Sequence, residues 1–373
     1  MVNYIKLKLE LNISPLSSWF PNYQKPLLIA GPCSAESEEQ LLTTAKGIAQ
    51  HYPNSVFRAG IWKPRTRPNT FEGAGSVALE WMKTVKKETG LLTATEVATA
   101  THVEEALKAG IDILWIGART TVNPFSVQEI ADALKGFDIP VFVKNPIYPD
   151  LQLWAGALER VNNAGIKKIA AIHRGFQSYD NKPFRNAPKW EIAIELKAAC
   201  CDLPMICDPS HIAGTPELIP YVAQKALDMA MDGLMIETHC NPSVALSDAQ
   251  QQVTPYELKI IMDDLLIRNS SIESIELQNK LDELRSVIQQ LDNELIELLG
   301  KRMACAEQIG EYKRDNNVTI LQVEHWKKLL EAGIENAQSF RLPEQFIKGL
   351  YQLIHDESIR RQTEVMNKKE PHL

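Results

Sequence analysis

The sequence lacks several features, and each absence excludes a class of protein. The 373-residue sequence contains no uninterrupted apolar stretch of about 18 residues, so no transmembrane helix is expected. The segment Met1–Asn12 mixes Lys6, Lys8 and Glu10 into its apolar positions, which is unlike a secretory signal peptide. The formal net charge is −7, so the overall charge favours neither nucleic acid nor a membrane surface as a partner.

Cysteines in the spacing of a redox or metal-binding motif are also lacking. The six cysteines show no CxxC spacing and no small secreted scaffold surrounds them, which favours a reduced, cytoplasmic compartment. With 45% apolar and 23% charged residues, the chain can bury a large core. Its length exceeds the size at which one core usually stops growing, so we expect one large domain and one small domain.

Short β-rich runs alternate with helical patterns from Leu27 to Arg268. The runs are apolar without alternation, as in parallel strands buried on both faces. Eight such units in roughly 240 residues match the usual size of a closed (β/α)₈ barrel, and an open doubly wound sheet is the alternative. The predicted strands are Leu27–Ser34, Ser55–Gly60, Leu91–Val97, Ile113–Ala118, Val141–Pro146, Lys168–Gly175, Met205–His211 and Gly233–His239.

Polar and ionisable residues gather where these strands end. In a (β/α)₈ barrel the carboxyl ends of the strands converge on one mouth, where the chemistry of such folds takes place. Residues scattered over the whole barrel sequence are therefore predicted to share one pocket. They are Cys33, Arg58, Glu96, Arg119, Lys144, Arg174, Asp208, His211 and Glu237.

Two subsets of these residues indicate what the pocket binds. Six cations at one mouth predict an anionic, phosphate-bearing ligand, because arginine grips phosphate or carboxylate through two parallel hydrogen bonds. Any one of them alone is as easily an ordinary surface charge. The six are Arg58, Lys63, Arg65, Arg119, Lys144 and Arg174.

The second subset is a set of candidate metal ligands, Cys33, His211, Glu237 and Asp248. The eighth strand of a closed barrel lies beside the first, so these four can surround one ion. A thiolate, an imidazole and two carboxylates suit a divalent transition metal such as manganese, iron, cobalt or zinc. Alternatively, Cys33 is a small buried hydrophobe and His211 a core histidine.

The pattern changes after Arg268. We predict the barrel domain at residues 1–268, a linker at 269–274 and an all-α domain at 275–373. Leucine and isoleucine recur at spacings of three and four from Leu277 onward, which predicts one helix to about Tyr312. Two shorter helices are expected near Glu324–Asn336 and Pro343–Glu364.

Five short motifs of the barrel region, in this order along the chain, resemble those of type Iβ 3-deoxy-D-arabino-heptulosonate 7-phosphate (DAHP) synthase. The motifs are Gly31-Pro32-Cys33-Ser34, Lys63-Pro64-Arg65-Thr66, Ile116-Gly117-Ala118-Arg119, Asp208-Pro209-Ser210-His211 and Leu246-Ser247-Asp248. The resemblance spans about Leu27 to Arg268. It implies a metal-dependent condensation of phosphoenolpyruvate with erythrose 4-phosphate and water, releasing phosphate.

The resemblance also implies roles for individual residues. Cys33, His211, Glu237 and Asp248 would bind one divalent metal ion, manganese or a similar one, and no organic cofactor is expected. Asp208 would lie beside the aldehyde, Glu96 would handle water or a proton, and Lys63 would be catalytic as well as substrate-binding. Arg58, Lys63, Ala118, Arg119, Lys144 and Arg174 would hold phosphoenolpyruvate, while Arg65 and Thr66 would hold the phosphate of the aldose.

The chain departs from the family in two places. The family has an Arg-Gly pair after the lysine of the fifth strand, where this chain reads Lys144-Asn145-Pro146. Many relatives also carry a regulatory domain before the barrel, whereas here about 26 residues precede it, so feedback control is expected to come from elsewhere. The competing family is 3-deoxy-D-manno-octulosonate 8-phosphate synthase. Its Ala-Asn-Arg-Ser-Ser loop is absent, and Lys63–Thr66 fills that place.

The segment from Leu277 to about Gln362 resembles the all-α, AroQ-type chorismate mutase, which rearranges chorismate to prephenate without a metal or a nucleophile. The matching residues are Arg285, Arg302, Lys313, Ser358 and Gln362. Arg285 and Arg302 are 17 positions apart, hence roughly 25 Å along one helix, so one small substrate cannot touch both. A homodimer is therefore expected, and the resemblance implies that each site takes Arg302 and Lys313 from one subunit and Arg285 from its partner.

Three positions weaken the second resemblance. Where the family places an acidic residue and an Arg-Glu pair, this chain has Gln322, His325 and Trp326. Tryptophan cannot replace a carboxylate as a hydrogen-bond acceptor. The alternatives to a bifunctional enzyme are a synthase whose helical domain is regulatory or only dimerises, with prephenate or chorismate as the effector, and a barrel that binds ligands without turnover.

Overall fold

The computed structural model describes residues 7–20, 22–64, 70–179, 181–268 and 274–367. The chain divides into two compact units, Met1–Ser270 and Ser271–Leu373. Arg65, Thr66 and positions 269–273 of the predicted linker lie outside the described residues. Among the helices that are described, none combines the length and the apolar character needed to cross a lipid bilayer.

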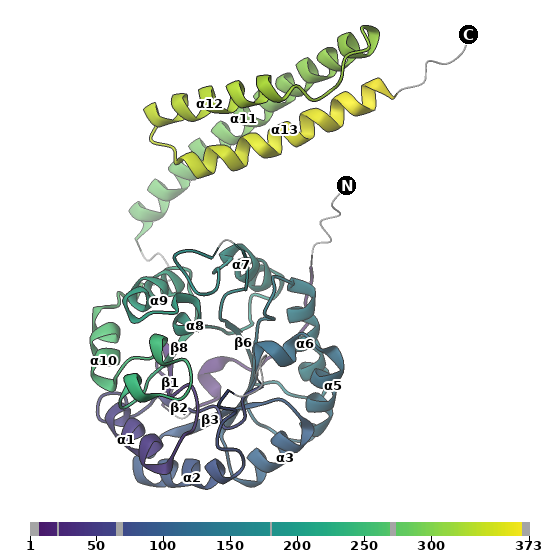
Figure 1. Cartoon of the computed structure of the whole chain (residues 1–373). Coiled ribbons are helices and arrows are strands. Elements are labelled where there is room, and N and C mark those ends of the chain that lie inside the picture. Colours follow the sequence, from purple (N-terminus) through teal and green to yellow (C-terminus); the bar gives the residue numbers. More distant parts are fainter. Residues whose placement is uncertain (1–6, 21, 65–69, 180, 269–273, 368–373) are drawn as a thin grey trace. The chain divides into compact units, whose positions relative to one another are not determined.

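The first unit is a closed barrel of parallel strands, which confirms the predicted fold class and rules out the open sheet (Figure 1). The strands follow one another in sequence order around the barrel. They are β1 (Leu27–Gly31), β2 (Val56–Arg58), β3 (Leu92–Val97), β4 (Ile113–Ile116), β5 (Val141–Lys144), β6 (Ile169–His173), β7 (Met205–Cys207) and β8 (Gly233–Glu237). Closure comes from β1 pairing with β8, with a register that runs from Leu27 opposite Gly233 to Gly31 opposite Glu237.

Helices surround the barrel on the outside (Figure 1). Several begin at residues whose side chains accept a hydrogen bond from the first turn, as the Ser, Thr, Asp or Asn in those places predicts; Thr254 and Glu257 form a complete capping box. The helices are α1 (Glu38–Ala49), α2 (Val77–Thr89), α3 (Ala100–Lys108), α4 (Ala118–Thr121), α5 (Pro124–Ala133), α6 (Leu151–Asn163), α7 (Trp190–Ala199), α8 (Pro209–Ala213), α9 (Ile219–Asp228) and α10 (Pro255–Asp264).

Most predicted strands were too long at their carboxyl ends. The seventh was expected to reach His211, but it stops at Cys207, and α8 begins at Pro209. The cause is local: the Asp208 carboxylate accepts a hydrogen bond from the backbone N–H of His211 at 3.1 Å, which caps a helix, and Pro209 suits its first position. Asp208 and His211, both predicted site residues, therefore lie where the chain turns from β7 into α8.

The barrel has an inner and an outer apolar layer because successive residues of each strand point to opposite faces. Leu28 and Ala30 of β1 pack outward under the helices, while Leu27 and Ile29 point into the barrel. Trp19 packs on this inner layer, with its ring centroid 6.1 Å from that of Phe142. Apolar side chains thus fill the interior, and the polar side chains gather beyond the carboxyl ends of the strands.

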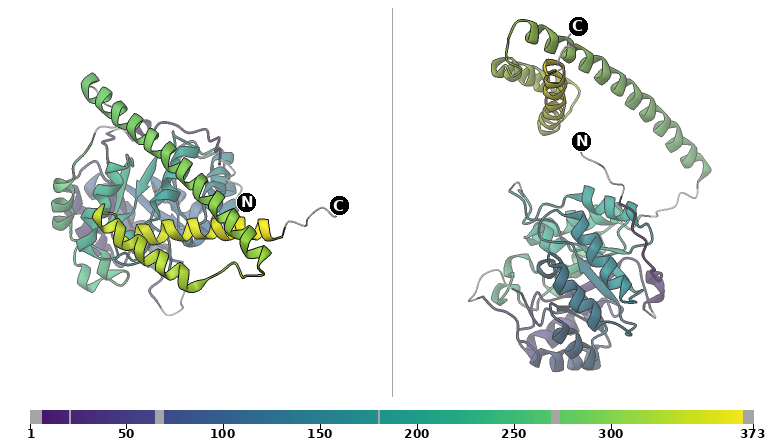
Figure 2. Two further views of the ribbon diagram at one scale, coloured as in Figure 1. Left: turned by 90° about the horizontal axis from the view of Figure 1, so that it is seen from above. Right: turned by 90° about the vertical axis from the view of Figure 1, so that its right-hand side faces the viewer.

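The second unit consists of α11 (Ile275–Asp315), α12 (Val323–Ser339) and α13 (Glu344–Met366). These three helices confirm the predicted all-α class. The carboxyl half of α11 packs on α13, where Arg361 pairs with Glu307 at 2.8 Å. The amino half of α11 extends beyond both other helices (Figure 2). Its apolar stripe, including Leu284, Ile288 and Leu291, is about half exposed in the single chain.

Gly31 provides a test of the barrel closure. Its φ of +145° favours glycine, and a Cβ at this position would lie 2.1 Å from the carbonyl oxygen of Arg58, a backbone atom that cannot move away freely. We expect Gly31→Ala to destabilise the barrel by about 3 kcal/mol or more, measured as a lower thermal unfolding midpoint. Gly136→Ala is the matched control, because its φ is +84° but nothing lies within 4 Å. Equal effects of the two changes would contradict the close approach.

Candidate active site

A polar cavity of about 450 Å³ opens at the carboxyl ends of the strands. Most of the residues predicted to share a pocket line it, although they come from β2, β3, β5 and the segments that follow β2, β4, β6, β7 and β8. The predicted residues along its wall are Arg58, Lys63, Glu96, Ala118, Arg119, Lys144, Arg174, His211 and Asp248. Cys33, Asp208 and Glu237 are fully buried beside this wall, in contact with residues that line it.

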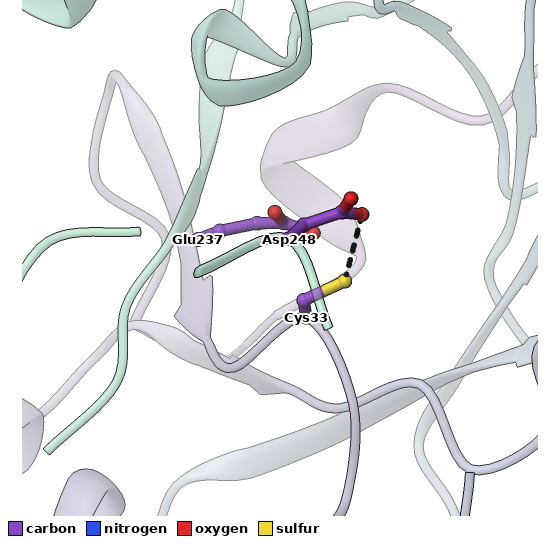
Figure 3. A group of neighbouring side chains, drawn as sticks. All are labelled: Cys33, Glu237 and Asp248. Carbon is purple, nitrogen blue, oxygen red and sulfur yellow. Dashed lines mark hydrogen bonds between the residues drawn. The ribbon is translucent and has the colours of Figure 1, made fainter. Parts of the chain in front are cut away.

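Three candidate metal ligands converge in the described part of the chain. Cys33, Glu237 and Asp248 each offer one donor atom, and these atoms lie within 4.8 Å of one another (Figure 3). The pairing of β1 with β8 brings Cys33 and Glu237 together, since Gly31 lies opposite Glu237. The Cys33 thiol donates to Asp248 Oδ2 at 3.2 Å.

His211, the fourth predicted ligand, stands to one side of this group. Its Nδ1 bonds to Asp208 Oδ1 at 3.0 Å, and its Nε2 lies 3.8 Å from Glu237 Oε1. The same Asp208 carboxylate also accepts from the backbone N–H of His211, so it fixes both the backbone and the ring of this histidine. The structure thus groups three of the four predicted ligands tightly and places the fourth against one of them.

The donor set fits a divalent transition metal. Among the described residues Glu237 Oε1 is buried without a hydrogen-bond partner, and its ion pair with Arg58 Nη1 is long at 3.4 Å, so a metal ion would satisfy this oxygen more fully. A thiolate, an imidazole and two carboxylates are the ligands such ions take in proteins. The residues present are therefore suited to hold the ion.

The protonation of the acids agrees with a cation site. Burial opposes the charge of Asp248, but His211 and Arg185 nearby hold its pKa below the usual range. His211 and Lys144 likewise hold the pKa of Asp208 well below its ordinary value despite burial. Burial, together with the charge of Glu237, raises the pKa of Cys33 to about 12 in the metal-free protein. Binding of an ion would therefore release the Cys33 proton.

Arginine and lysine side chains line the same cavity. Arg58 is 1% exposed, with its guanidinium 4.9 Å from the centre of the Trp115 ring. Among the described residues its Nε has no hydrogen-bond partner, while its Nη1 lies 3.4 Å from Glu237 Oε1, so Nε is the atom available to an anion. Lys144 pairs with Asp208 at 2.8 Å, and Lys63 donates to Cys33 Sγ at 2.7 Å. The cavity can therefore neutralise an anion beside the metal ligands.

The Gly117-Ala118-Arg119 motif has a packing reason. A Cβ at Gly117 would lie 2.0 Å from Glu96 Oε1, so only glycine lets the Glu96 carboxylate come this close to the backbone. Trp115 Nε1 donates to the other oxygen of Glu96 at 3.1 Å. Glu96 is thus held rigidly at the cavity wall.

Sequence reasoning missed Arg185, Asn186 and Gln251. Arg185 and Asn186 line the cavity, and Arg185 Nη2 pairs with Asp248 Oδ1 at 3.0 Å. Both follow β6 at a distance, inside the loop 174–189 before α7, so a search restricted to strand ends passes over them. The length of that loop was the available signal, because loops after barrel strands build the mouth.

The helical unit has a separate cavity of about 330 Å³. Its lining includes Arg302, Lys313, Ser358 and Gln362, four of the residues named in the resemblance to chorismate mutase. Arg302 Nη1 donates to Ser358 Oγ at 2.6 Å, and Lys313 Nζ donates to Gln362 Oε1 at 3.2 Å. No described residue that lines the cavity is acidic, which favours an anionic ligand.

The three atypical positions, Gln322, His325 and Trp326, also line this cavity. The Trp326 ring stacks on His355, with centroids 3.9 Å apart. Arg285 does not line the cavity, and its guanidinium instead pairs with Asp282 on the exposed surface of α11. One chain therefore supplies four of the five matching residues to its own cavity.

Comparisons with known proteins agree with both resemblances. Residues 21–268 match the DAHP synthetase I family, and residues 284–363 match chorismate mutase type II. A phospho-2-dehydro-3-deoxyheptonate aldolase from Thermotoga maritima is 30% identical over 226 residues, which cover 61% of this chain. They cover 64% of that protein, which is less than two thirds of its length.

A further relative and a solved structure are similar to part of this chain. A 2-dehydro-3-deoxyphosphooctonate aldolase from Francisella tularensis subsp. holarctica is 27% identical over 251 residues, covering 62% of this chain and 87% of that protein. The crystal structure of the Thermotoga maritima DAHP synthase superposes with a TM-score of 0.58 at 27% identity, covering 64% of this chain and 67% of that one.

Proposed function

The chain belongs to the DAHP synthetase I family and carries a chorismate mutase type II domain, and from this we propose that it is a bifunctional enzyme. The barrel condenses phosphoenolpyruvate with erythrose 4-phosphate and water to DAHP and phosphate, and the helical unit converts chorismate to prephenate. The observation that supports the first activity most is a cavity whose wall carries several cations and beside which the donor atoms of Cys33, Glu237 and Asp248 converge.

Phosphoenolpyruvate carries a phosphate and a carboxylate, and the cavity offers cations for both. Arg58, Lys63, Arg119, Lys144 and Arg174 bind it, with Ala118 against it. Arg58 contributes most, because its Nε has no hydrogen-bond partner among the described residues and would otherwise be buried at a cost in free energy. For the phosphate of erythrose 4-phosphate we propose Arg65 and Thr66, on the sequence resemblance alone.

The ion is held by Cys33, His211, Glu237 and Asp248, with manganese as the first candidate and iron, cobalt and zinc as others. When bound, it polarises the aldehyde carbonyl as a Lewis acid. Asp208 is fixed by Lys144 and His211 and orients the aldehyde end of the aldose. Glu96, held by Trp115, positions water or accepts its proton. Lys63 stabilises negative charge that develops on the substrates.

In the helical unit Arg302, Lys313 and Gln362 hold the two carboxylates and the ether oxygen of chorismate in a compact conformation, and Ser358 orients Arg302. Fixing that conformation and stabilising charge on the ether oxygen is enough to accelerate a pericyclic rearrangement. Arg285 completes the site from the partner subunit of a homodimer. The exposed apolar stripe on the amino half of α11 supports this dimer, since such a face is stable only when it is covered.

The two activities should be separable by mutation in the same chain. Cys33→Ser removes the thiolate, so we expect synthase turnover to fall at least about 100-fold while chorismate turnover is unchanged. Arg302→Ala should do the reverse, lowering chorismate turnover roughly 10²–10³-fold. The measurements are loss of phosphoenolpyruvate absorbance with erythrose 4-phosphate, with and without chelator, and loss of chorismate absorbance.

Three results would contradict this assignment. Full synthase turnover after chelation would exclude the metal, and no turnover of chorismate by the unmodified chain would leave the helical unit with a regulatory role. Faster turnover with arabinose 5-phosphate than with erythrose 4-phosphate would favour the octulosonate reaction of the second group of relatives.

The shared mutase site can be tested by mixing two inactive variants. Arg285→Ala and Arg302→Ala subunits are each expected to lack activity as homodimers. After they are unfolded together and refolded, half of the dimers are mixed, and one of the two sites in each mixed dimer is intact, so about a quarter of the original activity should return. If the mixture stays inactive while a dimer forms, Arg285 does not act across the interface.

We also propose that the helical unit confers feedback control, with prephenate or chorismate as the effector. The cationic cavity of that unit would bind either dicarboxylate. The synthase rate should fall as prephenate is titrated to saturation. Arg302→Ala should abolish this inhibition by prephenate and leave the synthase rate in the absence of prephenate unchanged. A rate that stays constant across the titration would exclude prephenate as an effector.

A further inference from the structure

Two of the candidate metal ligands use their second oxygen to bind the protein itself. Asp248 Oδ1 accepts from Arg185 Nη2 at 3.0 Å, while Oδ2 faces the Cys33 thiol at 3.2 Å. Glu237 Oε2 accepts from Gln251 Nε2 at 2.6 Å, while Oε1 has no hydrogen-bond partner among the described residues. Each carboxylate therefore has one oxygen bound by Arg185 or Gln251 and a second beside another candidate ligand, since Glu237 Oε1 lies 3.8 Å from His211 Nε2.

Arg185 is the common element of these two contacts. Besides pairing with Asp248, its Nη1 donates to the side-chain oxygen of Gln251. A guanidinium has donors only, so the amide oxygen of Gln251 must face Arg185, and the amide nitrogen must then face Glu237. Gln251 is fully buried, which leaves water no part in choosing the orientation of its amide.

The backbone holds Arg185 in place for this task. Its N–H donates to the carbonyl oxygens of Ile212 at 3.0 Å and of Ala213 at 3.2 Å, at the end of the helix that carries His211. A Cβ at Gly214 would lie 2.4 Å from the Arg185 Cβ, so the glycine at this point allows the loop to approach. The loop after β6 and the loop after β8 are thus joined through one arginine.

We propose that Arg185 and Gln251 are positioning residues of the metal site. They hold Asp248 and Glu237 so that Oδ2 of the first and Oε1 of the second are the donor atoms for the ion. Neither residue is a ligand. This inference rests on the proposed function only in that it requires the ion to bind at these carboxylates.

The charge of Arg185 allows a purely electrostatic effect on metal affinity to be distinguished from a positioning effect. Arg185 is itself a cation, so if it acted only through its charge, its presence would weaken the binding of a metal ion, and a variant that keeps the charge would leave affinity unchanged. Positioning predicts the opposite: Arg185→Lys keeps the charge but loses the fork that spans Asp248 and Gln251, and affinity should fall. Gln251→Leu changes no charge at all and removes the contact to Glu237.

The experiment measures the dissociation constant of Mn²⁺ for the full-length, metal-stripped chain, from the electron paramagnetic resonance signal of the free ion. We expect Gln251→Leu and Arg185→Lys each to weaken binding about 10–100-fold, the range found when partners that orient metal ligands are removed. The Mn²⁺ concentration that gives half-maximal synthase activity should rise by the same factor. Gln250→Leu is the control, because this neighbouring glutamine is exposed, and its affinity should be unchanged.

The possible failures can be told apart. Variants that bind Mn²⁺ as tightly as the unmodified chain, when that chain does bind it, overturn the positioning role and leave the proposed function standing. An unmodified chain that binds no Mn²⁺, Fe²⁺, Co²⁺ or Zn²⁺ overturns the proposed metal site. If Gln251→Leu lacks a cooperative unfolding transition, the Mn²⁺ affinity of Arg185→Lys tests the proposal instead. Arg185 lines the cavity and its side chain is 45% exposed, so this substitution is expected to leave the fold intact.

Discussion

The pairing of β1 with β8 is the constraint on which the barrel site depends. It places Gly31 opposite Glu237 and so brings the loop that carries Cys33 against the strand that ends in Glu237. A shift of this register by one residue would turn Glu237 to the outside of the barrel, because the side chains of a strand alternate between its faces. Gly31 allows the chain to leave β1 beside the backbone of Arg58, where any side chain would collide with a carbonyl group.

This closure has an electrostatic consequence. Glu237 and Asp208 are buried without exposure to solvent, and each lies against a cation, Arg58 at 3.4 Å and Lys144 at 2.8 Å. Buried charges of this kind cost free energy unless they are paired and hydrogen-bonded. The protein therefore retains an arrangement that contributes little to stability but prepares a cavity in which a cation and an anion can bind side by side.

The fold could be predicted from the sequence because apolar runs and turn residues report directly on parallel strands, and the polar residues at strand ends were found for the same reason. Strand ends were less accurate, since Asp208 and Pro209 start a helix where the pattern suggested more strand. Arg185 and Gln251 were missed because they act from within loops, through contacts that span 63 and 14 positions of the chain. In α11 the apolar stripe predicted the helix, but no sequence pattern within one chain indicates which surface covers the stripe.

The central claim is that these segments together hold one ion, and a crystal soaked with Mn²⁺ tests it most directly. Anomalous diffraction should locate one strong peak in the barrel cavity, within about 2.0–2.5 Å of Cys33 Sγ, His211 Nε2, Glu237 Oε1 and Asp248 Oδ2. A fully occupied peak elsewhere in the barrel, or coordination that excludes Cys33, would contradict the account.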